Sequence, residues 1–89
     1  MRILAFWLAK EGKPSHISTV EFGASSKFGI RTEHYDIAGY EGEKLAKQYG
    51  VSNFPAIVAL SNVGMVLQMW SGYATPTMDQ LKYYVDRGM

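Results

Sequence analysis

The sequence contains no cysteine, and this absence excludes a whole class of chemistry. Without a thiol the chain can form no disulfide, hold no metal through thiolates and carry out no thiol-disulfide exchange. Histidine is also scarce, because His16 and His34 are the only two and neither has an acidic partner at the spacing of a metal site. We therefore predict no metal site and no cofactor, and we interpret both imidazoles as surface groups.

Net charge is small as well. Nine lysine and arginine residues stand against eight acidic ones, and this balance is too close to neutral to indicate nucleic acid or an anionic membrane as a partner. The apolar run at residues 3–9 is far shorter than a membrane span and lacks the cleavage pattern of a secretory signal. We expect a cytoplasmic protein with no nucleic-acid or membrane partner, folded as one domain over residues 1–89.

Two stretches of the sequence are apolar without alternation, which is typical of central strands covered by helices on both faces. They are residues 3–9 and 56–60. Edge strands are expected at residues 30–37, where charged and apolar side chains mix, and at residues 65–70, which alternate. The turn residues 62–64 predict a hairpin between the last two strands.

Helix ends can be read from a few residues. Ser15 is a predicted N-cap. Gly29 and Gly50 each follow the predicted end of a helix, where the next residue adopts a left-handed backbone conformation that glycine takes at no steric cost. Thr77 and Gln80 form a capping-box pattern ahead of the last helix. The expected helices span residues 15–28, 43–49 and 78–87.

Residues 49–60 read Tyr-Gly-Val-Ser-Asn-Phe-Pro-Ala-Ile-Val-Ala-Leu, a helix end, a short loop and Pro55 ahead of an apolar strand. Proline lacks an amide hydrogen, so it must begin the strand. This pattern resembles the thioredoxin superfamily, the thioredoxin and glutaredoxin core, in which a cis-proline opens the strand. The resemblance implies an α/β, thioredoxin-like fold of order β-α-β-α-β-β-α, with a four-stranded mixed sheet of order 2-1-3-4 and helices on both faces.

The chain departs from the catalytic pattern of that family at two places. Phe6 and Trp7 match the first core strand of thioredoxins, but Ala5 stands where the family has a buried aspartate that assists proton transfer. The Cys-Gly-Pro-Cys position falls on residues 12–15, Gly-Lys-Pro-Ser, which keep the proline but neither sulfur. The resemblance therefore implies a redox-inactive member rather than a catalyst.

The family's substrate groove also predicts where a partner would bind. Its walls are the loop before the first helix, the residue before the cis-proline and the glycine loop after the last strand, and the backbone on the strand side of Pro55 would be free to pair with an extended peptide. Phe54 and Tyr73 would either contact the partner or pack on each other. The implied binding residues are Lys13, Pro14, Ser15, Phe54, Pro55, Ser71, Gly72 and Tyr73.

Three functions follow as alternatives. The first is a non-enzymatic domain that binds a protein or an extended peptide on the cis-proline face. The second is a small glutathione-binding or glutathione-transferase-like enzyme, in which Ser15 would hydrogen-bond the glutathione thiolate. The third is a structural subunit that forms a homodimer through an edge strand, at residues 30–37 or 65–70.

Overall fold

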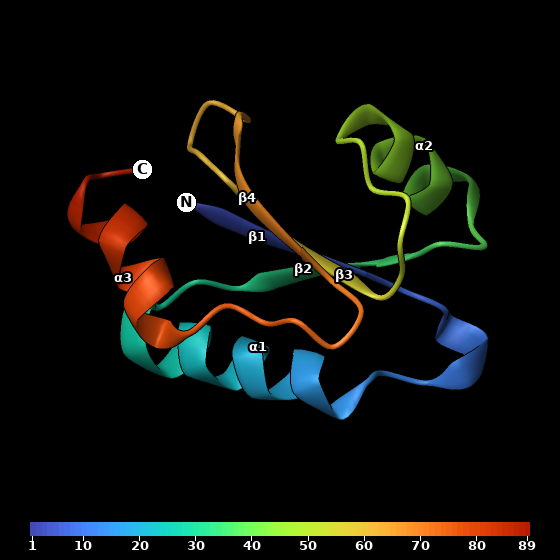
Figure 1. Cartoon of the computed structure of the whole chain (residues 1–89), viewed down its shortest axis with the longest axis horizontal. Coiled ribbons are helices and arrows are strands. Elements are labelled where there is room, and N and C mark those ends of the chain that lie inside the picture. Colours follow the sequence, from blue (N-terminus) through green and yellow to red (C-terminus); the bar gives the residue numbers. More distant parts are fainter.

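A computed structural model describes the whole chain, residues 1–89, as a mixed α/β fold (Figure 1). Its order of strands and α-helices is the predicted one, with one unpredicted 3-10 helix after the first strand. The elements are β1 (Arg2–Trp7), η1 (Ala9–Glu11), α1 (Ser15–Phe28), β2 (Thr32–Asp36), α2 (Tyr40–Gln48), β3 (Ala56–Leu60), β4 (Val66–Ser71) and α3 (Met78–Asp86).

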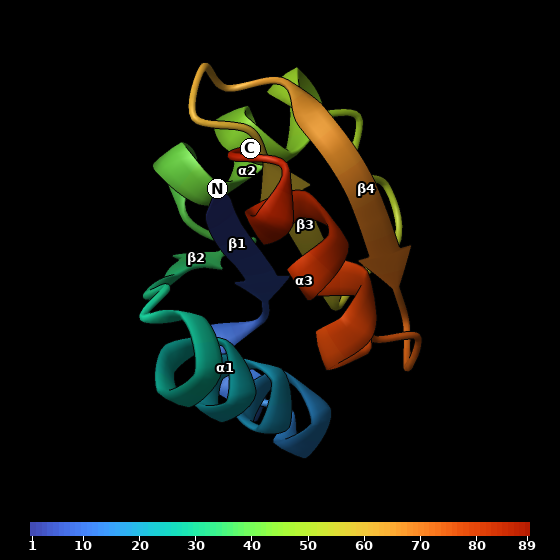
Figure 2. The ribbon, with the colours of Figure 1, turned by 90° about the vertical axis from the view of Figure 1, so that its left-hand side faces the viewer.

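The sheet has the strand order β2-β1-β3-β4, which confirms the predicted order 2-1-3-4. β1 pairs parallel with β2 and antiparallel with β3, and β3 pairs antiparallel with β4. Helices α1 and α3 cover one face and α2 covers the other (Figure 1), while Figure 2 shows β4 at the outer side of the sheet. None of the helices is both long and apolar enough to cross a membrane.

The core lies on both faces of β1 and β3. Ile3 and Ala5 join the cluster under α1 and α3, whereas Leu4 and Phe6 join the cluster under α2. All four side chains are fully buried, as is the whole of β3. Each of these strands therefore contributes side chains to both layers. Burying one large apolar side chain stabilises a fold by about 1.5–3 kcal/mol.

The sequence predicted the N-caps of α1 and α3, and only the second prediction is confirmed. Before α3, the Thr77 amide donates to Gln80 Oε1 at 2.8 Å and the Gln80 amide donates to Thr77 Oγ1 at 3.1 Å, which confirms the capping box. The prediction that Ser15 caps α1 is wrong. Pro14 is the N-cap, and its carbonyl accepts the Ile17 amide at 3.1 Å, so Ser15 is already the first helical residue.

Helix α2 begins at Tyr40, earlier than the predicted residue 43, because a tertiary contact accommodates Gly42 within the helix. Gly39 is its N-cap, and Gly42 is buried against the end of β2. A Cβ atom on Gly42 would lie 2.0 Å from the carbonyl oxygen of Asp36, a distance that no side chain could occupy. Only glycine therefore lets α2 approach the sheet this closely.

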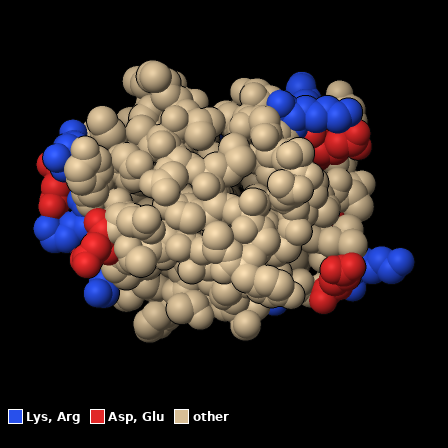
Figure 3. Space-filling model, viewed as in Figure 1, with Lys and Arg blue, Asp and Glu red and all other residues tan.

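Charged side chains are unevenly distributed over the surface. On the face shown in Figure 3, acidic and basic groups lie at the two ends and the broad centre carries none. β4 crosses the centre of this view in Figure 1. The part of the molecule around β4 is therefore uncharged on this face.

We predict that Gly42→Ala destabilises the fold although alanine is the better helix former. The methyl group forces a backbone shift, and overpacking of this kind lowers the free energy of unfolding by roughly 2 kcal/mol or more. Urea denaturation measures the change. Gly23→Ala is the control, since its Cβ would meet only the flexible side chain of Met78, at 2.8 Å from the sulfur. Equal stability of the two variants would contradict the close approach of α2.

Candidate functional site

A cavity of about 250 Å³ lies beside Pro55, between the loop that follows β1 and the loop that precedes β3. The peptide bond between Phe54 and Pro55 is cis. Three of the predicted binding residues, Pro14, Phe54 and Pro55, line this cavity together, and we refer to it as the Pro55 cavity. Its full lining is Trp7, Leu8, Glu11, Gly12, Pro14, Ile37, Phe54 and Pro55.

The backbone around Pro55 is paired differently from the expectation. The Gly72 amide donates to the Pro55 carbonyl at 2.8 Å, and Ser71 pairs with Ala56, so the glycine loop lies next to Pro55 as predicted. The Pro55 carbonyl is consequently not free to pair with a peptide, and that prediction is wrong. The backbone groups without a partner belong to Phe54. Its N–H and C=O form no hydrogen bond with another backbone group.

Two aromatic side chains of the predicted site are exposed but do not pack on each other. The Phe54 side chain is 39% exposed, and Tyr73 is 90% exposed. The Tyr73 ring lies against His16 of α1 instead, with the ring centroids 5.5 Å apart. Phe54 therefore keeps its exposed face beside the Pro55 cavity.

Lys13 and Ser15 flank the Pro55 cavity without lining it. Lys13 Nζ forms an ion pair with Glu21 Oε1 at 2.8 Å and is directed along α1. Ser15 is exposed, and its carbonyl accepts a hydrogen bond from the Thr19 hydroxyl at 3.1 Å. Neither residue presents its polar group to the cavity.

The structure also contains a hydrogen-bonded chain that the sequence did not reveal. Trp7 Nε1 donates to His34 Nδ1 at 3.0 Å, and His34 Nε2 lies 2.5 Å from Glu21 Oε2. An indole nitrogen only donates, so Nδ1 accepts and Nε2 carries the proton that bonds the carboxylate. The interpretation of His34 as a surface imidazole is thus wrong. Its partners lie 13 and 27 positions away on other elements, beyond the reach of local patterns.

Glu21 is the acceptor of two hydrogen bonds, one from His34 and one from Lys13. The hydrogen bond from His34 is the main influence that lowers the pKa of its carboxyl, and the bond from Lys13 lowers it further, while burial opposes both. Glu21 therefore ties α1 to β2 through His34 and to the loop after β1 through Lys13. The arrangement holds one wall of the Pro55 cavity, because Trp7 lines it.

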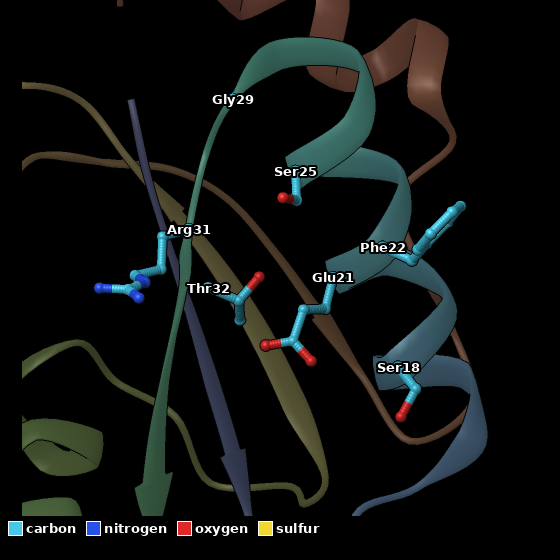
Figure 4. A pocket seen from close by; sticks show the side chains of 7 residues that line it. All are labelled: Ser18, Glu21, Phe22, Ser25, Gly29, Arg31 and Thr32. Carbon is cyan, nitrogen blue, oxygen red and sulfur yellow. The ribbon is translucent and has the colours of Figure 1, made fainter.

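The largest cavity of the molecule, about 400 Å³, lies elsewhere, between α1 and β2. Figure 4 shows Glu21 and Ser25 directed from α1 toward β2, whereas Arg31 points away from α1. Glu21 is already bonded, and Thr32 Oγ1 is buried with no hydrogen-bond partner. No predicted binding residue lines this cavity, whose walls are Ser18, Glu21, Phe22, Ser25, Gly29, Arg31 and Thr32.

We predict that Thr32→Val raises the free energy of unfolding by about 1 kcal/mol. Thr32 is only 7% exposed, and valine replaces its unpaired hydroxyl by a methyl group of the same shape. Thr32→Ser keeps the hydroxyl and removes the methyl, so we expect it to lower the free energy of unfolding by about 1 kcal/mol. Urea denaturation of both variants measures the effect, and a destabilised valine variant would show that the hydroxyl is paired.

We further predict that Glu21→Gln lowers the free energy of unfolding by about 1 kcal/mol at pH 7. Because folding lowers the pKa of Glu21, its charge stabilises the fold above the ordinary carboxyl pKa. That contribution is lost as the pH falls through the lowered value. Denaturation at a series of pH values should therefore show the two proteins converging below about pH 4.

The control for this experiment is Glu43→Gln. Glu43 pairs with Lys47 at 3.1 Å on the exposed side of α2, and surface pairs of this kind contribute little. A Glu21→Gln deficit that stays constant from neutral to acid pH would contradict the assigned role of its charge.

No protein-family model and no curated protein matches the sequence, but solved structures match the fold. Thioredoxin 1 from Thermosipho africanus has a TM-score of 0.66 and 16% identity, over 98% of this chain and 92% of its own. Thioredoxin O2 from Arabidopsis thaliana, in the oxidized state, has a TM-score of 0.68 and 21% identity, over 97% of this chain and 72% of its own. A mutant thioredoxin from Halobacterium salinarum has a TM-score of 0.60 and 18% identity, over 96% of this chain and 71% of its own. The chain therefore has the thioredoxin fold and lacks the cysteines of a thiol-disulfide catalyst.

Proposed function

We propose that this chain is a redox-inactive domain that binds a partner protein by holding an extended segment of it at the Pro55 cavity. The chain has no thiol, so it cannot exchange disulfides itself. The observation that carries the proposal is the unpaired backbone of Phe54 at the rim of a cavity with apolar walls. Extended peptides are recognised through such backbone groups, with nearby pockets for alternate side chains.

The cavity itself indicates what the bound segment contains. Trp7, Leu8 and Ile37 contribute apolar surface, and Glu11 is the one charged residue of the lining. A volume of about 250 Å³ lies below the usual range of roughly 300–1,000 Å³ for small-molecule sites. We infer that the cavity takes one apolar side chain of the partner, next to a basic residue that meets Glu11.

The glutathione alternative gains no support from the geometry. Ser15, on which that chemistry would depend, does not line the Pro55 cavity. Titration with reduced glutathione, followed by tryptophan fluorescence, separates the two functions, since Trp7 lines the Pro55 cavity. A saturable change would favour the alternative, and no change is expected.

We predict that peptides selected from a random display library on the immobilised protein bind at the Pro55 cavity. Phe54→Asp should weaken their binding at least tenfold, because it removes an aromatic contact and leaves a carboxylate that must lose its water when an apolar side chain binds. Isothermal titration measures the affinity, and amide chemical shifts locate the contact. The selected sequences should be rich in apolar residues followed or preceded by lysine or arginine.

The matched control is Tyr40→Asp, which makes the same kind of change at an exposed aromatic residue on α2. It should leave both binding and thermal stability unchanged. Peptides that bind both variants as tightly as the unchanged protein, or that shift amide signals far from Pro55, would overturn the proposal. A Phe54→Asp variant that melts many degrees lower would instead assign Phe54 to packing.

A further inference from the structure

A long segment of the chain contains no ionisable acid or base other than tyrosine. Residues 48–78 include no aspartate, glutamate, lysine, arginine or histidine. The segment spans β3 and β4 and the loops on either side of them. β4, which belongs to this segment, crosses the centre of the view in Figure 1, where Figure 3 shows no charged side chain.

The two edges of the sheet therefore differ in character. β2 carries Glu33, His34 and Asp36, and Glu33 is paired with Arg2 at 2.8 Å. Charged edges of this kind prevent strands of separate molecules from pairing. β4 has six residues, Val-Leu-Gln-Met-Trp-Ser, with no charge and no proline.

The outer edge of β4 presents backbone groups as well as apolar side chains. Gly72 bonds Pro55, and bonded pairs alternate along an antiparallel ladder, so the N–H and C=O of Met69 point away from β3. β4 has no strand on that side. At its start, Val63, Met65 and Val66 are exposed.

We propose that β4 is a dimer interface, where it pairs antiparallel with β4 of a second copy across a two-fold axis and joins the two sheets. Such an interface places each strand opposite itself, so a charged edge would meet its own charge. β4 satisfies this requirement, and β2 does not. An uncharged face also offers no electrostatic attraction to an acidic or basic partner, which favours a second copy as the occupant.

Sedimentation velocity over a range of protein concentrations tests the proposal. We expect a reversible dimer whose dissociation constant rises at least tenfold in Val66→Lys, since the change places a charged side chain on the uncharged edge of each copy. Phe22→Lys is the control, because Phe22 is also exposed and apolar but lies on α1, outside the uncharged segment. A protein that stays monomeric at its solubility limit, or equal dissociation constants for the two variants, would overturn the proposal.

The absence of cysteine allows a sharper test, since any introduced cysteine is the only thiol of the chain. Directly opposite residues of an antiparallel pair have Cβ atoms about 4.5–5.5 Å apart, close to disulfide distance. Single cysteines at Val66, Gln68 and Ser71 should differ in oxidative cross-linking, with a maximum at the position nearest the axis. Arg31→Cys, beside β2, and Tyr83→Cys, on α3, should cross-link slowly. Faster cross-linking at Arg31 or Tyr83 than along β4 would place the interface elsewhere and refute this one.

Discussion

The rest of the structure depends on the burial of β1 and β3 on both of their faces. These two strands have no polar side that could face water except at Arg2, so the chain must supply a helical layer above and below them. Helices α1 and α3 cover one face and α2 the other. Gly42 shows how demanding this packing is, because α2 closes on the end of β2 only where no Cβ intervenes.

The same pairing of central strands creates the Pro55 cavity. Phe6 at the end of β1 lies opposite Ala56 at the start of β3, so the loop after one strand lies beside the loop before the other. Ala56 in turn lies opposite Ser71, which brings the glycine loop to the same place. Three segments distant in sequence therefore meet at one end of the sheet. The bonded chain from Trp7 through His34 to Glu21 then holds the wall of this cavity to α1.

The two proposed interfaces lie on different parts of the surface and use different properties of it. At the Pro55 cavity, an apolar pocket and the unpaired backbone of Phe54 suit a segment of a partner. Along β4, an open and uncharged edge suits a second copy. The fold leaves both regions at the surface, because the loops beside Pro55 meet at one end of the sheet and β4 is an edge strand.

What the sequence determined by itself was the order of elements and the placement of Pro14 and Phe54 beside Pro55. Unbroken apolar runs, the capping box at Thr77 and the proline at a strand start are local signals, and local signals specify local structure. Only the tertiary structure decided which side chains bond each other. Pro14 and not Ser15 is the N-cap of α1, and Tyr73 packs against His16 and not against Phe54. His34 found Trp7 and Glu21, because contacts between elements depend on packing distances that no short stretch of sequence contains.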